Sequence, residues 1–266
     1  MIRPGPRNAL TDVAGIQVGS AEDLAAMTGV TIVLADRPLR AAVDVRGGAP
    51  GTINTEALRP GGLVEQVHGL VLSGGSTFGL EAATGLMSWL SARGVGFTGW
   101  GPTIPFVAGA ILFDLANGGD KAWGETPPYR GLAIAAADAA ALEVRQGTAG
   151  AGTGATAGPL KGGLGTASAV DPATGVTLAA LVAVNALGGV THPGQPSCWA
   201  RCRDPTRRSV CWPPTQGSTG STCSASRCTP RPGSRRRSGR SPRSTTATPC
   251  SPTRPRCRSR RPATTC

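Results

Sequence analysis

The first 190 residues of this 266-residue chain contain no cysteine, few aromatic side chains and fewer basic than acidic residues. They hold 11 Lys and Arg against 14 Asp and Glu, a net charge of −3. The last 76 residues lack Lys, Leu, Ile, Met, Phe and Tyr, and they contain 16 Arg, one acidic residue and all eight cysteines, a net charge of +15. The formal net charge of +12 for the whole chain describes neither part, so a uniformly basic globular protein is excluded.

This contrast divides the chain near residue 190. Residues 1–190 are long enough for one sizeable domain. Residues 191–266 have too few large apolar side chains to offset the entropy of the chain, so we predict that this Arg-, Pro-, Ser- and Cys-rich tail is disordered. Its cysteines form no paired C-x-x-C motif, so we expect no zinc site. The part of the chain that can fold has no cysteine, so we expect no disulfide framework for the whole chain.

Long apolar segments are also missing. No apolar run reaches the roughly 20 residues that a membrane span needs. The first twelve residues lack the apolar core of a signal peptide. These absences predict a soluble, cytoplasmic protein with no membrane partner.

The hydrophobic pattern predicts strands mixed with a few helices. Predicted strands cover residues 29–35, 41–45, 68–73, 111–115, 166–170 and 176–184. Predicted helices cover residues 77–92 and 132–145, the first capped by Ser76 and stopped by Gly94. The apolar face of the first helix would be formed by Phe78, Ala82, Leu86 and Leu90. A turn at Asp36-Arg-Pro joins the first two strands, and Asp171–Gly175 makes a hairpin of the last two, so the order indicates an α/β or α+β fold.

Three common catalytic or nucleotide-binding arrangements are not supported. A Ser-His-Asp triad needs an available histidine, but residues 1–190 hold only His68, at the start of a buried strand, where a structural role is expected. Lys161 follows Leu160, so no G-x-x-x-x-G-K-[ST] phosphate-binding loop is present. The glycines of residues 150–154 follow a predicted helix rather than a strand, which argues against a dinucleotide loop. No cofactor and no metal is expected.

Hydrogen-bond donors and one cation remain as candidate site residues. Lys161 lies in a Gly-rich loop and Asn185 lies near the end of an apolar strand; each by itself is at least equally well explained as a solvated charge or a strand end. Together with Gly74, Gly75 and the helix N-terminus at Ser76, they offer ammonium and amide donors suited to a developing oxyanion. No nucleophile with an adjacent base accompanies them.

Four Gly-containing segments carry a family resemblance: Arg46–Thr52, Leu72–Glu81, Leu160–Ser168 and Ala183–Gly188. They resemble the L-aminopeptidase/D-esterase family of P1 peptidases, which includes the nylon-oligomer endohydrolases. The resemblance runs from about Leu10 to Val190. Several motifs in the same order make it specific.

This resemblance implies a fold and a chemistry. The fold is the four-layer αββα sandwich of N-terminal-nucleophile hydrolases, incomplete in this chain. The precursor cleaves itself before a Ser or Thr, which then attacks an amide bond with its own α-amine as the base. Lys161 and Asn185 match the site lysine and the oxyanion asparagine of the family, whereas Phe78 stands where the nylon enzyme has a site tyrosine. Small peptides or amides are the implied substrates, and a homo-oligomer is the implied assembly.

The family's nucleophile segment is missing, but the tail accounts for it if the same gene is read one base out of frame. Each shifted codon joins the last two bases of one parent codon to the first base of the next. Residues 206–216 then admit Asn-Thr-Thr-Ile-Gly-Val-Leu-Ala-Thr-Asp-Ala, with a threonine at the position of Arg207. Residues 246–252 admit the second missing segment, Asp-Gly-Asp-Thr-Val-Phe-Ala. We therefore predict a frameshifted tail and an inactive chain.

The alternative is a non-enzymatic protein whose basic tail binds nucleic acid through phosphate contacts. The tail uses Arg without Lys, and it has unpaired cysteines and only two Trp. Nucleic acid is therefore not the expected partner.

Overall fold

The computed structural model describes residues 1–59, 61–99, 101–188 and 190. These residues belong to the first of two units into which the chain divides, Met1–Thr215. The predicted disordered tail, including position 207, lies outside the described residues.

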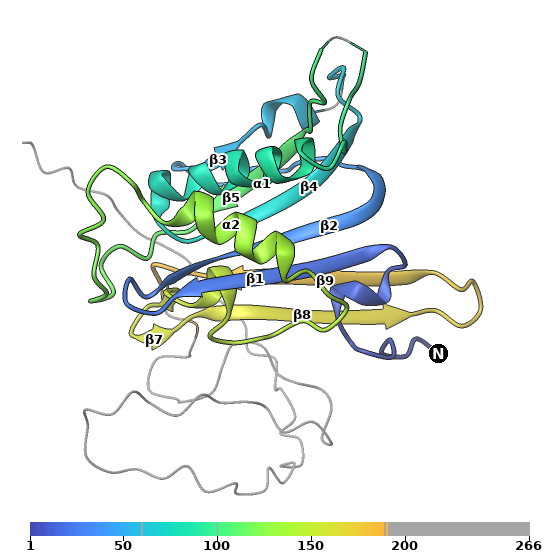
Figure 1. The fold of residues 1–266 in the computed structure, drawn as a ribbon. Coiled ribbons are helices and arrows are strands. Elements are labelled where there is room, and N and C mark those ends of the chain that lie inside the picture. Colours follow the sequence, from blue (N-terminus) through green and yellow to red (C-terminus); the bar gives the residue numbers. More distant parts are fainter. Residues whose placement is uncertain (60, 100, 189, 191–266) are drawn as a thin grey trace, which may run out of the picture. The chain divides into compact units, whose positions relative to one another are not determined.

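A five-stranded sheet forms the centre of the described part, in the strand order β1-β2-β4-β5-β3 (Figure 1). The strands are β1 (Ile16–Asp23), β2 (Thr28–Arg40), β3 (Thr52–Ile53), β4 (Gln66–Ser73) and β5 (Val107–Ile111). Only β4 and β5 pair in parallel; the other neighbours are antiparallel. The parallel pair is connected through helix α1 (Glu81–Ser91), as a parallel crossover requires.

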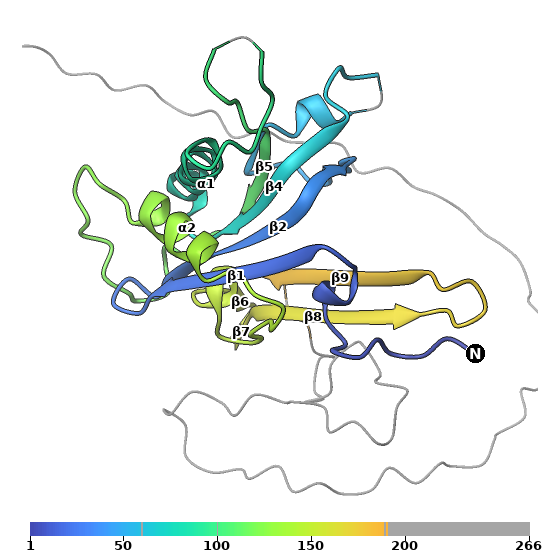
Figure 2. The ribbon, with the colours of Figure 1, turned by 45° about the vertical axis from the view of Figure 1, so that its right-hand side comes forward.

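Two helices and a hairpin cover opposite faces of this sheet (Figure 2). Successive side chains of a strand point to opposite faces. Val30 and Ile32 accordingly pack with α1 and with α2 (Tyr129–Asp138), whereas Val33 packs toward Leu181 of the hairpin β8 (Gly163–Val170) and β9 (Thr177–Val184). The described residues thus contain one helical layer and two sheet layers, and the predicted mixed α/β class is confirmed.

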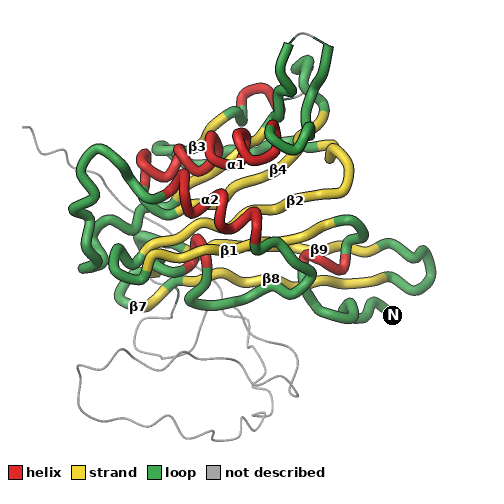
Figure 3. The backbone as a smooth tube through the Cα atoms, in the orientation of Figure 1, coloured by secondary structure: helices red, strands yellow, loops and turns green. Residues whose placement is uncertain are grey.

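The remaining elements are short. Strands β6 (Thr156–Ala157) and β7 (Leu160–Lys161) form a small separate hairpin. The 3-10 helices are η1 (Leu10–Asp12), η2 (Glu56–Leu58), η3 (Ser76–Leu80) and η4 (Gly150–Gly152). The connections from β5 to α2 and from α2 to β8 are mostly loop (Figure 3).

The prediction of two strands joined at Asp36-Arg-Pro is wrong. Residues 28–40 form the single strand β2, and residues 41–45 are not a strand. Pro38 has no amide hydrogen to donate, and it lies where the pairing with β4 jumps from Leu34 to Leu39. This irregularity lets the strand continue through a proline.

The predicted helix over residues 77–92 begins differently. Its first turn is the 3-10 helix η3, which has three residues per turn, so Phe78 falls off the apolar face and is 46% exposed. Ala82, Leu86 and Leu90 are buried as predicted. Gly75 occupies the N-cap position, and no side chain caps the helix, so the capping role of Ser76 is wrong.

Other boundaries can be compared directly. The hairpin is confirmed, since the Asp171 carboxylate accepts the Ala173 amide and the Thr174 hydroxyl within the turn. Gly94 is confirmed as a helix stop by its φ of 71°. The strand expected at 111–115 lies at 107–111, and the helix expected at 132–145 begins at Tyr129, directly after Pro128.

Candidate functional site

The carboxyl ends of the parallel strands β4 and β5 meet at one edge of the main sheet. Gly74–Ser76 directly follow β4, and Asp114 lies three residues after β5. In sheets with parallel strands, ligands bind at this edge. The sequence motif around Gly74 and Gly75 is therefore at the end of the sheet where a site is expected.

The turn formed by Gly74–Ser76 is fastened through its own amides. The Gly74 amide donates to the Gly29 carbonyl oxygen (2.9 Å) and the Ser76 amide to that of Leu112 (3.0 Å). The Gly75 amide donates to Asp114 Oδ1 (2.7 Å). All three amides thus donate to acceptors inside the protein, so the oxyanion role expected for Gly74, Gly75 and Ser76 stays a prediction that needs these bonds to open.

Lys161 and Asn185 are held by one short segment, residues 153–156. Lys161 Nζ donates to the carbonyl oxygen of Thr153 (2.7 Å). The amide of Thr156 donates to Asn185 Oδ1 (3.0 Å). Because a backbone N–H requires an acceptor, this bond fixes which atom of the Asn185 side chain is oxygen, and the NH₂ group remains as the donor.

Lys161 is the only charged residue in the lining of a hollow of about 580 Å³ in the described part of the chain. The hollow is otherwise lined mainly by small and apolar residues, including Ala157, Leu164 and Val184. Partial burial lowers the pKa of Lys161, because the ammonium form is the one that burial disfavours. Among the described residues no carboxylate forms an ion pair with it.

Residues 150–156, the segment to which Lys161 is bonded, reach the same sheet edge as the turn after β4. The Gly150 amide donates to Glu22 Oε1 (2.6 Å) at the end of β1. Further along, Asn117 Nδ2 donates to the carbonyl oxygen of Gly154 (3.3 Å) and to that of Met27 (2.7 Å). The structure therefore brings the two predicted site residues and the Gly75 turn to one edge of the sheet.

Asp114 is a residue that the sequence reasoning missed. Its side chain is almost fully buried, and Oδ2 accepts the hydroxyl of Thr28 (2.6 Å) while Oδ1 accepts the Gly75 amide. The available signal was an acidic residue inside the apolar run 106–115, since charged side chains are rarely buried without a specific partner.

Phe78 begins a row of three aromatic rings that leads into the core. Its ring meets Trp123 edge-on at a centroid distance of 5.7 Å, and Trp123 meets Tyr129 in the same way at 5.7 Å. Tyr129 is fully buried, and within the described residues its hydroxyl has no hydrogen-bond partner. Burial raises the pKa of Tyr129 to about 12. Phe78 thus supplies an exposed apolar ring next to the Gly75 turn, without a hydroxyl.

His68 lies away from these residues, at the amino end of β4. Its Nδ1 accepts the Phe106 amide (3.0 Å), and its ring packs edge-on against Phe97. Burial lowers the pKa of His68. The contacts match the predicted structural role.

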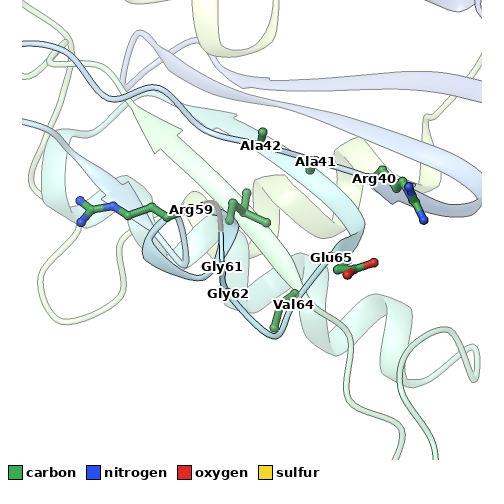
Figure 4. Close-up of a pocket in the computed structure, with 9 residues that line it drawn as sticks. Arg40, Ala41, Ala42, Arg59, Gly61, Gly62, Val64 and Glu65 are labelled. Atoms are coloured by element: carbon green, nitrogen blue, oxygen red, sulfur yellow. The ribbon is translucent and has the colours of Figure 1, made fainter.

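A second hollow, of about 420 Å³, lies at the carboxyl end of β2, the end that contains Arg40 (Figure 4). Arg40, Arg59 and Glu65 are the charged residues in its lining. The two arginine side chains extend to opposite sides of the hollow, so their charges do not converge on a common point. We assign no role to it.

The described residues contain no group of three His, Cys, Asp or Glu side chains arranged to hold a metal ion. None of the helices in this part of the chain has the length and apolar character to cross a membrane.

Comparison with known proteins gives curated relatives and solved structures. An uncharacterized aminopeptidase of Mycobacterium tuberculosis (strain ATCC 25618 / H37Rv) is 44% identical over 200 residues, which cover 72% of this chain and 57% of the relative. A 6-aminohexanoate-oligomer endohydrolase of Kocuria sp. (strain KY2) is 33% identical over 150 residues, which cover 56% of this chain and 39% of that relative. The chain therefore spans only a little more than half the length of the most similar of these relatives.

Two solved structures share the fold. A Burkholderia sp. beta-aminopeptidase is 28% identical with a TM-score of 0.57, covering 71% of this chain and 55% of that protein. The L-aminopeptidase D-Ala-esterase/amidase of Ochrobactrum anthropi is 25% identical with a TM-score of 0.54. The match covers 70% of this chain and 55% of that protein, which is described as a new variant of the Ntn hydrolase fold. None of these relatives supports the nucleic-acid-binding alternative.

The family match covers most of the chain. Residues 8–219 match peptidase family S58, so the match continues beyond Val190, where we expected the resemblance to end. The predicted likeness to aminopeptidases and nylon-oligomer endohydrolases is confirmed by the relatives above. This chain belongs to peptidase family S58.

Proposed function

We propose that residues 1–190 are the large-chain part of an amide- or peptide-bond hydrolase of the N-terminal-nucleophile type. The attachment of both Lys161 and Asn185 to residues 153–156 carries this proposal. It places one ammonium and one amide donor on a common support, beside a hollow with a largely apolar lining. A carbonyl group that gains negative charge needs donors of this kind.

Each residue has a distinct role in the proposed reaction. A hydroxyl oxygen attacks the amide carbon while an α-amine accepts its proton, and the tetrahedral oxyanion receives a hydrogen bond from Asn185 Nδ2. The C–N bond then breaks, the leaving nitrogen takes the proton, and water hydrolyses the resulting ester. The Lys161 ammonium stabilises the negative charge without forming a covalent bond.

The nucleophile itself is absent from the chain as written. Position 207 is an arginine, whose guanidinium is not deprotonated in proteins and is no nucleophile. The shifted reading of residues 206–216 and 246–252 supplies both missing segments in the correct order, which supports a change of reading frame near residue 190. We infer that the chain neither cleaves itself nor hydrolyses substrate.

Repairing the reading frame tests the function. Shifting the frame by one base near codon 190 should place a threonine at position 207 and produce a protein that cuts itself before that threonine. The two fragments should then hydrolyse small aminoacyl amides. Replacing the restored threonine with alanine should abolish both events, because one hydroxyl performs both attacks. A repaired protein that folds but stays uncut and inert would contradict the proposal.

Asn185→Ala in the repaired protein is the matched test of the oxyanion role. We expect folding to be retained and turnover to fall by about 10²–10³, the usual effect of removing one oxyanion donor. Asn8→Ala, which removes an asparagine whose Oδ1 accepts the Ser168 amide in the N-terminal part of the chain, is the comparison variant and should leave turnover unchanged.

The setting of the enzyme is part of the same proposal. The substrate is a small peptide or amide, and the intact protein is a cytoplasmic homo-oligomer. Residues 1–190 contain no cysteine, so this part of the chain needs no oxidising compartment to form disulfides. Further association is supported by the apolar outer face of β9, where Leu178 and Val182 are 74% and 52% exposed.

A further inference from the structure

The segment after β5 joins three separate parts of the candidate site. Asp114 holds the turn after β4 through the Gly75 amide and holds β2 through the Thr28 hydroxyl. Three residues later, Asn117 holds residues 153–156, the segment to which Lys161 is bonded, because its Nδ2 donates to the carbonyl oxygen of Gly154. The same nitrogen donates to the carbonyl oxygen of Met27, and Asn117 Oδ1 accepts the Gly119 amide (3.1 Å).

These segments also touch each other closely around the two side chains. A Cβ atom added to Gly154 would lie 2.6 Å from Asp114 Oδ2 and 2.6 Å from Asn117 Nδ2. A Cβ atom added to Gly74 would collide with the same carboxylate and with the Thr28 hydroxyl. Gly154 follows Thr153, whose carbonyl oxygen accepts Lys161 Nζ, so a movement of Gly154 moves the anchor of Lys161.

The chemistry of Asp114 indicates that its side chain orients neighbouring groups rather than adding to the stability of the fold. Within the described residues no Lys or Arg forms an ion pair with this buried carboxylate. Burying an unpaired charge is unfavourable, and an apolar side chain of similar size would fill the space at a lower cost. A carboxylate adds two acceptor atoms in fixed directions, and here they fix one backbone amide and one hydroxyl.

We propose that Asp114 and Asn117 are positioning residues that hold the Gly75 turn and residues 153–156, which anchor Lys161, against each other. The inference rests on the proposed function, in which Lys161 acts on the substrate. Neither side chain acts on the reacting atoms; both act through Lys161 and through the turn.

Single-atom exchanges in the full 266-residue chain test this role. Asn117→Asp turns a carboxylate oxygen toward the carbonyl oxygens of Met27 and Gly154, and Asp114→Asn removes the buried charge. Asp138→Asn is the isosteric control, because Asp138 is exposed and bonds Trp89 and Arg93 on the helical layer. Leu90→Ala, in the helical core, controls for loss of stability alone.

The readout is the acylation rate of each amine by acetic anhydride as a function of pH, measured by mass spectrometry. The chain suits this experiment because Lys121 and Lys161 are its only lysines, and the exposed Met1 amine serves as the reference. In the unaltered chain Lys161 should titrate below an ordinary lysine, since burial lowers its pKa.

In Asn117→Asp and Asp114→Asn the pH midpoint of Lys161 acylation should move up toward that of an ordinary lysine. Its limiting acylation rate should rise by about tenfold, the effect of losing one buried hydrogen bond on local opening. Asp138→Asn and Leu90→Ala should change that rate by less than about twofold. Asn117→Ala replaces Asn117→Asp if the latter does not fold.

Folded variants at 114 and 117 whose Lys161 profile equals that of the unaltered chain would overturn the proposal. Equal changes in Leu90→Ala would do the same, because they would reduce the effect to general destabilisation. The labelling needs no catalysis, so a failure of the proposed hydrolase activity and a failure of this inference are separate results.

Discussion

Tyr129 is the residue at which burial and chemistry oppose each other most clearly. Its ring packs against Trp123 at the first residue of α2 and belongs to the core under the helical layer, yet its hydroxyl finds no hydrogen-bond partner in the described part of the chain. An unsatisfied buried hydroxyl is unfavourable by about 1–3 kcal/mol. The ring therefore stabilises the layer through its apolar area, and the hydroxyl opposes it.

The ionisation of Tyr129 can be measured directly because it is the only tyrosine in the chain. Absorbance at alkaline pH should give a midpoint of about 12 for the folded protein, against the ordinary value of 10.0 in denaturant. From pH 10 to 12 the unfolded chain loses the proton while the folded protein keeps it. The free energy of unfolding should therefore fall as the pH rises through this window, by up to about 2 kcal/mol, and not change below it. Tyr129→Phe should remove this part of the pH dependence; a folded-state midpoint near 10 would show that the hydroxyl reaches water.

Gly75 shows how one position can require glycine for two reasons. Its φ is 84°, and a Cβ atom added there would collide with the ring of Tyr129. Gly118 has a similar φ of 87°, but a Cβ atom there would meet open space in the described structure.

The pair of substitutions Gly75→Ala and Gly118→Ala separates these reasons. Gly118→Ala should lower the free energy of unfolding by about 1–2 kcal/mol, from backbone strain alone. Gly75→Ala should lower the free energy of unfolding by a further ~1–3 kcal/mol, because the added methyl group also clashes with Tyr129. Denaturant unfolding gives both values, and equal losses would mean that Tyr129 moves aside freely.

At the scale of elements, β9 presents two unlike faces. Leu181 points toward the core group of Ile16, Val18 and Val33, whereas Leu178 points outward and is 74% exposed. This alternation follows from the two-residue period of a strand. The inner face attaches the hairpin to the main sheet.

Leu181→Ala should lower the free energy of unfolding by about 1–2 kcal/mol, since the side chain is only partly buried and the fully buried range is 2–5 kcal/mol. Leu178→Ala is the matched control on the same strand and should change it by less than about 0.5 kcal/mol. Thermal or denaturant unfolding measures both. The reverse order would mean that the outer face of β9 is the buried one in the folded protein in solution.

At the scale of the whole molecule, the chain as written combines a family-like domain with a tail of different composition. Position 207 is arginine, and our proposal puts the missing threonine nucleophile there, so we expect the purified chain to run as one full-length band after long incubation. Two stable fragments that divide near residue 206 would contradict this expectation. The frame-repaired protein is the positive control on the same gel.

The sequence by itself determined the mixed α/β class, the β8–β9 hairpin and the identity of Lys161 and Asn185 as candidates. Each depends on neighbouring residues: the period of two in strands, the side-chain bonds of Asp171 within its turn, and short motifs with fixed spacing. The continuous strand β2 was missed because a pairing irregularity with β4 accommodates Pro38, and that irregularity depends on another strand.

Only the tertiary structure decided which hydrogen-bond donors of the candidate site are already bonded within the protein. The Gly75 amide is bonded by Asp114, which lies 39 positions away in the sequence, and Asn117 reaches Gly154, 37 positions away. Such contacts depend on how β4 and β5 align at one sheet edge, and local sequence patterns carry no record of that alignment.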